Sequence, residues 1–126
     1  MKTYQPITPE IIDKLKAITG PSYVKTDKDI LLQYQTDYET NPAMFRVPEA
    51  AVLPANAEEI SQIVKLANEY DFPITVRGGG TSLAAGAIPV CGGLVLSMER
   101  LNKIIELNEE GMYMTVEAGV RTIDMQ

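Results

Sequence analysis

Three consecutive glycines, Gly78, Gly79 and Gly80, constrain the fold of this chain more than any other feature of the sequence. They follow residues 73–76, a segment of proline and β-branched residues that is typical of a buried strand. Without Cβ atoms, a backbone can take positive φ and approach a ligand closely. Successive amides in such a loop can point inward around an anion. The pattern predicts a strand that ends in an anion-binding loop. The alternative is a tight turn that merely requires glycine.

The residues on either side of the glycines carry the charge and the donors that a phosphate group needs. Arg77 supplies a fixed positive charge, and Thr81 and Ser82 supply hydroxyl donors. No Lys follows the run, so a Walker A loop is excluded. Leu83 stands where a Gly-x-Gly-x-x-Gly fingerprint needs its third glycine, which excludes an NAD-binding Rossmann turn. The loop therefore predicts a phosphate or pyrophosphate site of another type.

The first part of the chain has the pattern of two helices and a connection. Residues 9–19 are expected to form a helix, because Thr8 can cap its start and Gly20 can end it. A second short helix is expected soon after residue 26, with three buried apolar side chains, Ile30, Leu31 and Tyr34. Residues 36–48 show no periodicity and are expected to form a surface connection.

The remainder predicts a strand–helix–strand unit, a further strand and a hairpin. Residues 50–53 form the first strand, and Asn56 caps the helix that follows, with an apolar face of Ile60, Ile63, Val64 and Ala67. Residues 94–97 are expected to be a third buried strand, followed by a hairpin over 103–118. Thr122 is expected to cap a new helix. The predicted fold class is α+β, a small, mainly parallel sheet with flanking helices and an antiparallel hairpin.

Composition excludes several classes of function. The 126 residues suit one small domain, and a net charge of -6 argues against nucleic acid as a partner. The chain has no His, so no His base or His metal ligand exists within it, and no metal site is expected. No apolar run approaches the roughly 20 residues that a membrane span needs. One cysteine and no secretory signal predict a cytoplasmic location.

Several ordered motifs together resemble a known family. They are Pro-Ile-Thr-Val-Arg-Gly-Gly-Gly-Thr-Ser-Leu at 73–83, Gly-Ala-Ile-Pro at 86–89, Gly-Leu-Val-Leu-Ser at 93–97 and Val-Glu-Ala-Gly-Val at 116–120. This order is similar to the FAD-binding domain of the vanillyl-alcohol oxidase and p-cresol methylhydroxylase (PCMH) type. Within that family, it most resembles glycolate oxidase GlcD-like subunits and FAD-linked D-lactate dehydrogenases. The resemblance covers roughly residues 8–126.

The resemblance implies roles for particular residues. The FAD pyrophosphate would be held by Gly78, Gly79, Gly80 and Thr81, with Ser82 adding a hydroxyl or amide contact. Arg77 would orient the loop or contribute charge, and Gly86 and Pro89 would line the same cleft. Some relatives attach FAD through a His directly after the glycines. Thr81 occupies that place here and cannot make the bond, so FAD is expected to bind non-covalently.

The resemblance also predicts the organisation of a longer parent protein. Residues 1–48 would be an N-terminal helical segment and connection, and residues 49–126 the first FAD-binding subdomain, truncated at its C-terminus. The parent would be a flavin-dependent oxidoreductase that oxidises a 2-hydroxyacid of the glycolate or D-lactate class to a 2-oxoacid. Its catalytic residues are expected beyond residue 126, so none is assigned here.

Two alternatives stay open at this point. The chain could be a non-catalytic module for another phosphorylated ligand, or an assembly domain without a ligand. An uncovered apolar face is expected to favour self-association or contact with a partner redox subunit.

Overall fold

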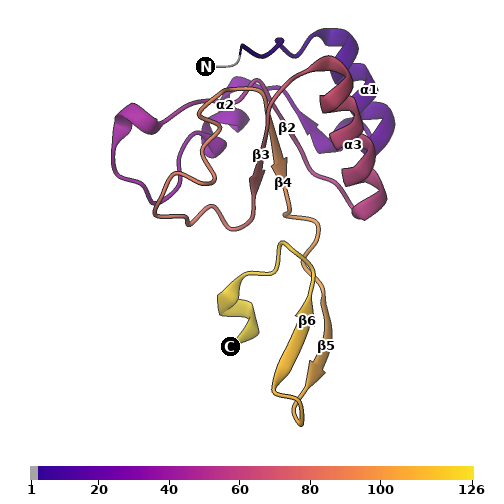
Figure 1. Cartoon of the computed structure of the whole chain (residues 1–126), viewed down its shortest axis with the longest axis vertical. Helices are drawn as coiled ribbons and strands as arrows, with labels where there is room; N and C mark the ends of the chain where they lie inside the picture. Colours follow the sequence, from indigo (N-terminus) through magenta and orange to yellow (C-terminus); the bar gives the residue numbers. More distant parts are fainter. Residues whose placement is uncertain (1–2) are drawn as a thin grey trace.

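A sheet with the strand order β1-β2-β4-β3 forms the centre of the protein in the computed structural model, which describes residues 3–126 (Figure 1). The strands are β1 Val24–Lys25, β2 Ala50–Val52, β3 Ile74–Arg77 and β4 Leu94–Ser97. Strand β4 pairs in parallel with both β2 and β3, and every residue of β4 is buried. The predicted third buried strand is therefore confirmed. It separates the two strands that the helix α3 connects.

Helices α1 Pro9–Thr19 and α3 Ala57–Tyr70 pack together over one face of this sheet. The caps are those that the sequence predicts. Thr8 Oγ1 accepts a hydrogen bond from the Ile11 amide at 3.4 Å, and Asn56 Oδ1 accepts one from the Glu59 amide at 2.9 Å. The core under the helices consists mainly of aliphatic side chains, among them Ile11, Leu15, Val52, Ile63, Leu94 and Leu96.

The opposite face of the sheet carries a smaller cluster. Helix α2 Lys28–Leu31 continues into a 3-10 turn, Leu32–Tyr34. Leu31 and Tyr34 pack on Ala51 and Val95 of the two central strands. Ile30 is 36% exposed, so its predicted burial was wrong. A 3-10 turn at Pro21–Tyr23 precedes β1. Another, Pro42–Met44, interrupts the expected irregular connection over residues 36–48.

The predicted apolar face of α3 was wrong in one position. Val64 is 42% exposed, whereas Leu66, which the prediction omitted, is buried beside Ile63 and Ala67. Both Val64 and Leu66 fit an apolar stripe next to Ile63 and Ala67, so the sequence leaves the exact rotation of the helix open. Contacts with α1 and the sheet fix that rotation.

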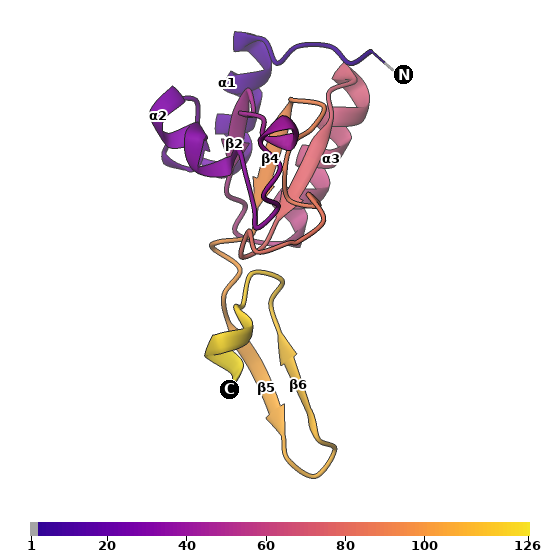
Figure 2. The same ribbon diagram turned by 90° about the vertical axis from the view of Figure 1, so that its left-hand side faces the viewer.

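The second sheet is an antiparallel hairpin that extends away from the first (Figure 2). It comprises β5 Ile104–Asn108 and β6 Tyr113–Val116, with a bulge between Ile104 and Glu106. The expected α+β class, with a mainly parallel sheet and a hairpin, is confirmed. After the hairpin the chain forms a 3-10 turn, Thr122–Met125. Arg121 holds its cap position, so the expected Thr122 cap was wrong.

Among residues 3–126, no helix combines the length and the apolar character that crossing a bilayer requires.

Candidate functional site

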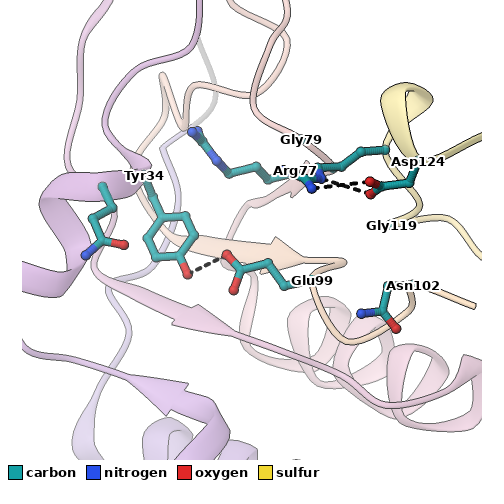
Figure 3. Close-up of a pocket in the computed structure, with 10 residues that line it drawn as sticks. Tyr34, Arg77, Gly79, Glu99, Asn102, Gly119 and Asp124 are labelled. Carbon is teal, nitrogen blue, oxygen red and sulfur yellow. Dashed lines mark hydrogen bonds and ion pairs between the residues drawn. The ribbon is translucent and has the colours of Figure 1, made fainter. Parts of the chain in front are cut away.

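A cavity of about 500 Å³ lies between the first sheet and the base of the hairpin (Figure 3). The glycine run begins at the carboxyl end of β3 and forms part of its wall, which is where open parallel sheets bind ligands. Its lining is mostly polar and comes from four segments of the chain, with Gln33, Tyr34, Arg77, Gly78, Gly79, Glu99, Asn102, Gly119, Arg121 and Asp124.

The glycine-rich loop presents a row of free backbone donors. Within the described residues 3–126, the amides of residues 78–82 donate no hydrogen bond to any protein acceptor. A Cβ at Gly78 would meet no atom within 4 Å, and one at Gly79 only the Thr81 side chain at 3.9 Å. The space beside the backbone at Gly78 and Gly79 is therefore free for a ligand. Successive unpaired amides are the groups that bind an anion, so this loop fits a phosphate or pyrophosphate group.

The Arg77 side chain connects the start of the loop to three other residues. Its Nη1 donates to the Thr36 carbonyl at 2.8 Å and reaches the Ala87 carbonyl at 3.5 Å. Its guanidinium also lies over the Tyr34 ring, 5.6 Å from the ring centre. Gly80 has φ +71°, and a Cβ there would overlap the Arg77 guanidinium. Glycine at position 80 thus allows both the turn and the position of the arginine.

Tyr34 and Glu99 form the polar end of the cavity, and sequence reasoning assigned neither to a site. The Tyr34 hydroxyl donates to Glu99 Oε1 at 3.1 Å. Burial, followed by the nearby Glu99 carboxylate, raises the pKa of Tyr34 to about 12. Glu99 comes two residues after β4, so the same edge-of-sheet rule that located the glycines could have found it.

The comparison with known families shows which family the chain belongs to. Residues 48–126 match the family model described as FAD binding domain. The chain belongs to this FAD binding domain family. The predicted recognition and the predicted cofactor, FAD, are thereby confirmed.

Relatives of this FAD-binding chain carry names of hydroxyacid enzymes. It is 37% identical over 119 residues to "Glycolate oxidase subunit GlcD" of Bacillus subtilis (strain 168), covering 94% of the chain and 25% of the relative. It is 33% identical over 122 residues to "D-lactate dehydrogenase" of Anaerostipes hadrus, covering 97% and 25%. The chain spans about a quarter of the length of these relatives.

A solved structure supports the PCMH-type fold. Substrate-bound p-cresol methylhydroxylase matches 90% of this chain and 22% of its own, with a TM-score of 0.80 and 30% identity. The first half of the PCMH-type architecture that the sequence predicts is therefore the observed fold.

The predicted cofactor residues divide into two groups in the FAD-binding chain. Arg77, Gly78 and Gly79 line the cavity. The other five are not among its lining residues: Gly80, Thr81, Ser82, Gly86 and Pro89. Ser82 Oγ accepts hydrogen bonds from the Ala84 and Gly86 amides, both at 3.2 Å, so it shapes the second half of the loop. Pro89 is fully buried.

The raised pKa of Tyr34 makes a testable prediction about the titration of the folded chain. Folding favours the neutral hydroxyl, so this stabilisation is complete below pH 10 and disappears as pH rises toward about 12. The last tyrosinate absorbance step of the folded chain should therefore belong to Tyr34, and Tyr34→Phe should remove it. Tyr38→Phe is the matched control, because Tyr38 is 63% exposed. A late step that survives in Tyr34→Phe would contradict this assignment.

Proposed function

We propose that this chain holds the pyrophosphate of FAD with the backbone amides of Gly78, Gly79, Gly80 and Thr81. The observation that carries the proposal is the row of unpaired amides at the end of β3, in residues 78–82. Arg77 lines the same cavity and contributes positive charge there, while its contacts with Thr36 and Tyr34 hold its side chain in place. Ser82 Oγ can still donate its hydroxyl hydrogen toward the cofactor while it accepts from Ala84 and Gly86.

The role of this chain is binding and orientation rather than bond breaking. When bound, FAD supplies the redox chemistry, and the protein positions it. We propose residues 49–126 as the first FAD-binding subdomain and residues 1–48 as the segment that packs on it. β1 from the first segment joins the sheet of the second, so the two would act as one cofactor support.

We propose an oxidoreductase as the parent activity, with a 2-hydroxyacid of the glycolate or D-lactate class oxidised to a 2-oxoacid. The names of two relatives support this class of substrate. Both relatives are about four times as long as this chain, so the residues that contact the substrate are expected outside it. A cytoplasmic location is proposed for the same parent protein.

The decisive test is FAD titration by calorimetry, combined with amide hydrogen exchange. It should be run on this chain and on the full natural polypeptide that carries it. FAD should slow exchange at residues 78–82, which exchange freely without it. Acid precipitation should release all the flavin into the supernatant, because Thr81 cannot bond to it covalently.

Two outcomes would contradict this function. Binding of FAD without protection of residues 78–82 would place the pyrophosphate elsewhere. Binding of ADP or another phosphorylated ligand, with no binding of FAD by either polypeptide, would favour the alternative of a module for another phosphorylated ligand.

Exposed apolar side chains on the hairpin support the self-association that the sequence predicts. Ile105, Leu107 and Met112 are 65%, 61% and 91% exposed, and all belong to β5 or the turn after it. We propose that a second copy of the chain covers these side chains. Sedimentation of the 126-residue chain should show concentration-dependent dimers that Leu107→Lys weakens. A monomer at all concentrations would overturn this proposal.

A further inference from the structure

Residues 36–38 contact the glycine-rich loop and the residues on either side of it, 77–87, at three points. At the start of the loop, Arg77 Nη1 donates to the Thr36 carbonyl at 2.8 Å. In the middle, the Tyr38 amide donates to the Ser82 carbonyl at 2.9 Å. At the end, the Ala87 amide reaches Asp37 Oδ2 at 3.5 Å. These contacts join residues that lie 41 to 50 positions apart in the sequence.

This segment is itself held by the core. Tyr34, just before it, is buried against Val95 and Ala51 of the central strands. The Asp37 carboxylate is fixed within its own turn, because Oδ1 accepts from the Glu39 amide at 2.7 Å. The predicted surface connection over residues 36–48 therefore begins with a segment that packs against the loop, although the Tyr38 side chain stays 63% exposed.

The contacts determine which groups of the loop can meet a ligand. The Ser82 carbonyl is bonded to the Tyr38 amide, so it is not available to face an anion, which it would repel. The amides of residues 78–82 stay unpaired in the same arrangement. A loop whose Ser82 carbonyl is engaged and whose amides at residues 78–82 are free is already close to the form that binds a pyrophosphate.

We propose that residues 36–38 are a loop clamp that holds the FAD-binding loop in its binding form. In this proposal, which rests on the function proposed above, the Tyr38 amide and Asp37 are positioning groups that do not touch the cofactor. The clamp lies outside residues 48–126, the part that matches the family model. Hence the N-terminal segment would contribute to cofactor affinity without contributing a ligand.

The physical basis is preorganisation. When only a fraction of molecules holds the binding form, the apparent dissociation constant rises by the inverse of that fraction. A loop with three glycines has many alternative conformations, and its ordering upon binding would cost affinity. Loss of the clamp should therefore weaken FAD binding by about tenfold, if it lowers the binding form to about one molecule in ten.

The test compares Tyr38→Pro with Tyr38→Ala in the full natural polypeptide. Proline removes the amide hydrogen that reaches Ser82, whereas alanine keeps it. The Tyr38 side chain is 63% exposed, so its loss alone should matter little. We expect the FAD dissociation constant to rise about tenfold in Tyr38→Pro and to stay near the wild-type value in Tyr38→Ala.

Hydrogen exchange of the Ala84 and Gly86 amides gives a second readout that needs no cofactor. Both donate to Ser82 Oγ and should lose protection in Tyr38→Pro but not in Tyr38→Ala. If Tyr38→Pro does not fold, Asp37→Ala replaces it. That variant removes a negative charge, which by itself would tighten binding of an anion. Weaker FAD binding by Asp37→Ala would therefore point to lost positioning.

The outcomes separate the clamp from the function on which it rests. Equal FAD affinity and equal exchange in Tyr38→Pro and Tyr38→Ala would overturn the clamp, even if both variants melt earlier than the wild type. A wild-type protein that does not bind FAD would overturn the proposed function instead. In that case, the exchange of Ala84 and Gly86 would still decide whether residues 36–38 hold the loop.

Discussion

Replacing Gly79 by Asp should abolish FAD binding and leave the unliganded fold intact. A Cβ at position 79 would lie 3.9 Å from the Thr81 side chain, which is an ordinary contact, so the substitution introduces no clash. The new carboxylate would stand among the unpaired amides and take the place of the pyrophosphate. Like charges brought together in a binding site cost about 3 kcal/mol or more. The dissociation constant for FAD should therefore rise by at least about a hundredfold.

Gly79→Ala is the matched control for this experiment. It adds only a methyl group at the same open position, so it should weaken FAD binding far less than Asp does. Calorimetric titration gives both affinities, and thermal melting without FAD should give equal midpoints for the two variants. FAD binding by Gly79→Asp at wild-type affinity would show that the pyrophosphate lies away from this loop.

Local signals explain why much of the fold could be predicted from the sequence. The caps at Thr8 and Asn56 act within one helical turn, and the proline and β-branched run at 73–76 is typical of a strand by itself. The glycine run is equally local, because the lack of Cβ atoms opens the backbone wherever it lies. For this reason, the cavity-lining residues Arg77, Gly78 and Gly79 could be singled out before the structure was known.

Several features that the sequence did not predict depend on contacts between distant segments. β1 has two residues and exists only because Val24 and Lys25 pair with Val52 and Ala51 of β2. The hydrogen bond from Tyr34 to Glu99 joins positions 65 residues apart. No periodicity marks such pairs, since each residue alone is compatible with a core or a surface position. The topology of the sheet brings them together.

Gly119→Ala should destabilise the junction between the hairpin and the first sheet. The Gly119 amide donates to the Leu101 carbonyl at 2.7 Å, so two backbone segments touch here. A Cβ at position 119 would overlap the Met98 carbonyl oxygen and lie 2.8 Å from that of Leu101. Backbone atoms cannot move aside as a flexible side chain can. The free energy of unfolding should therefore fall by about 3 kcal/mol, the upper range for overpacking.

Gly78→Ala is the control. Gly78 lines the same cavity, but a Cβ at position 78 would meet no atom within 4 Å. Urea denaturation should give a lower midpoint for Gly119→Ala and a nearly unchanged midpoint for Gly78→Ala. Gly119 also lines the cavity, so its variant should lose FAD affinity together with stability. Gly79→Asp should lose FAD affinity without losing stability. This difference would show that the fold requires Gly119, whereas only cofactor binding requires the open position at Gly79. Equal urea midpoints for the two alanine variants would mean that the hairpin is not fixed to the sheet at Gly119.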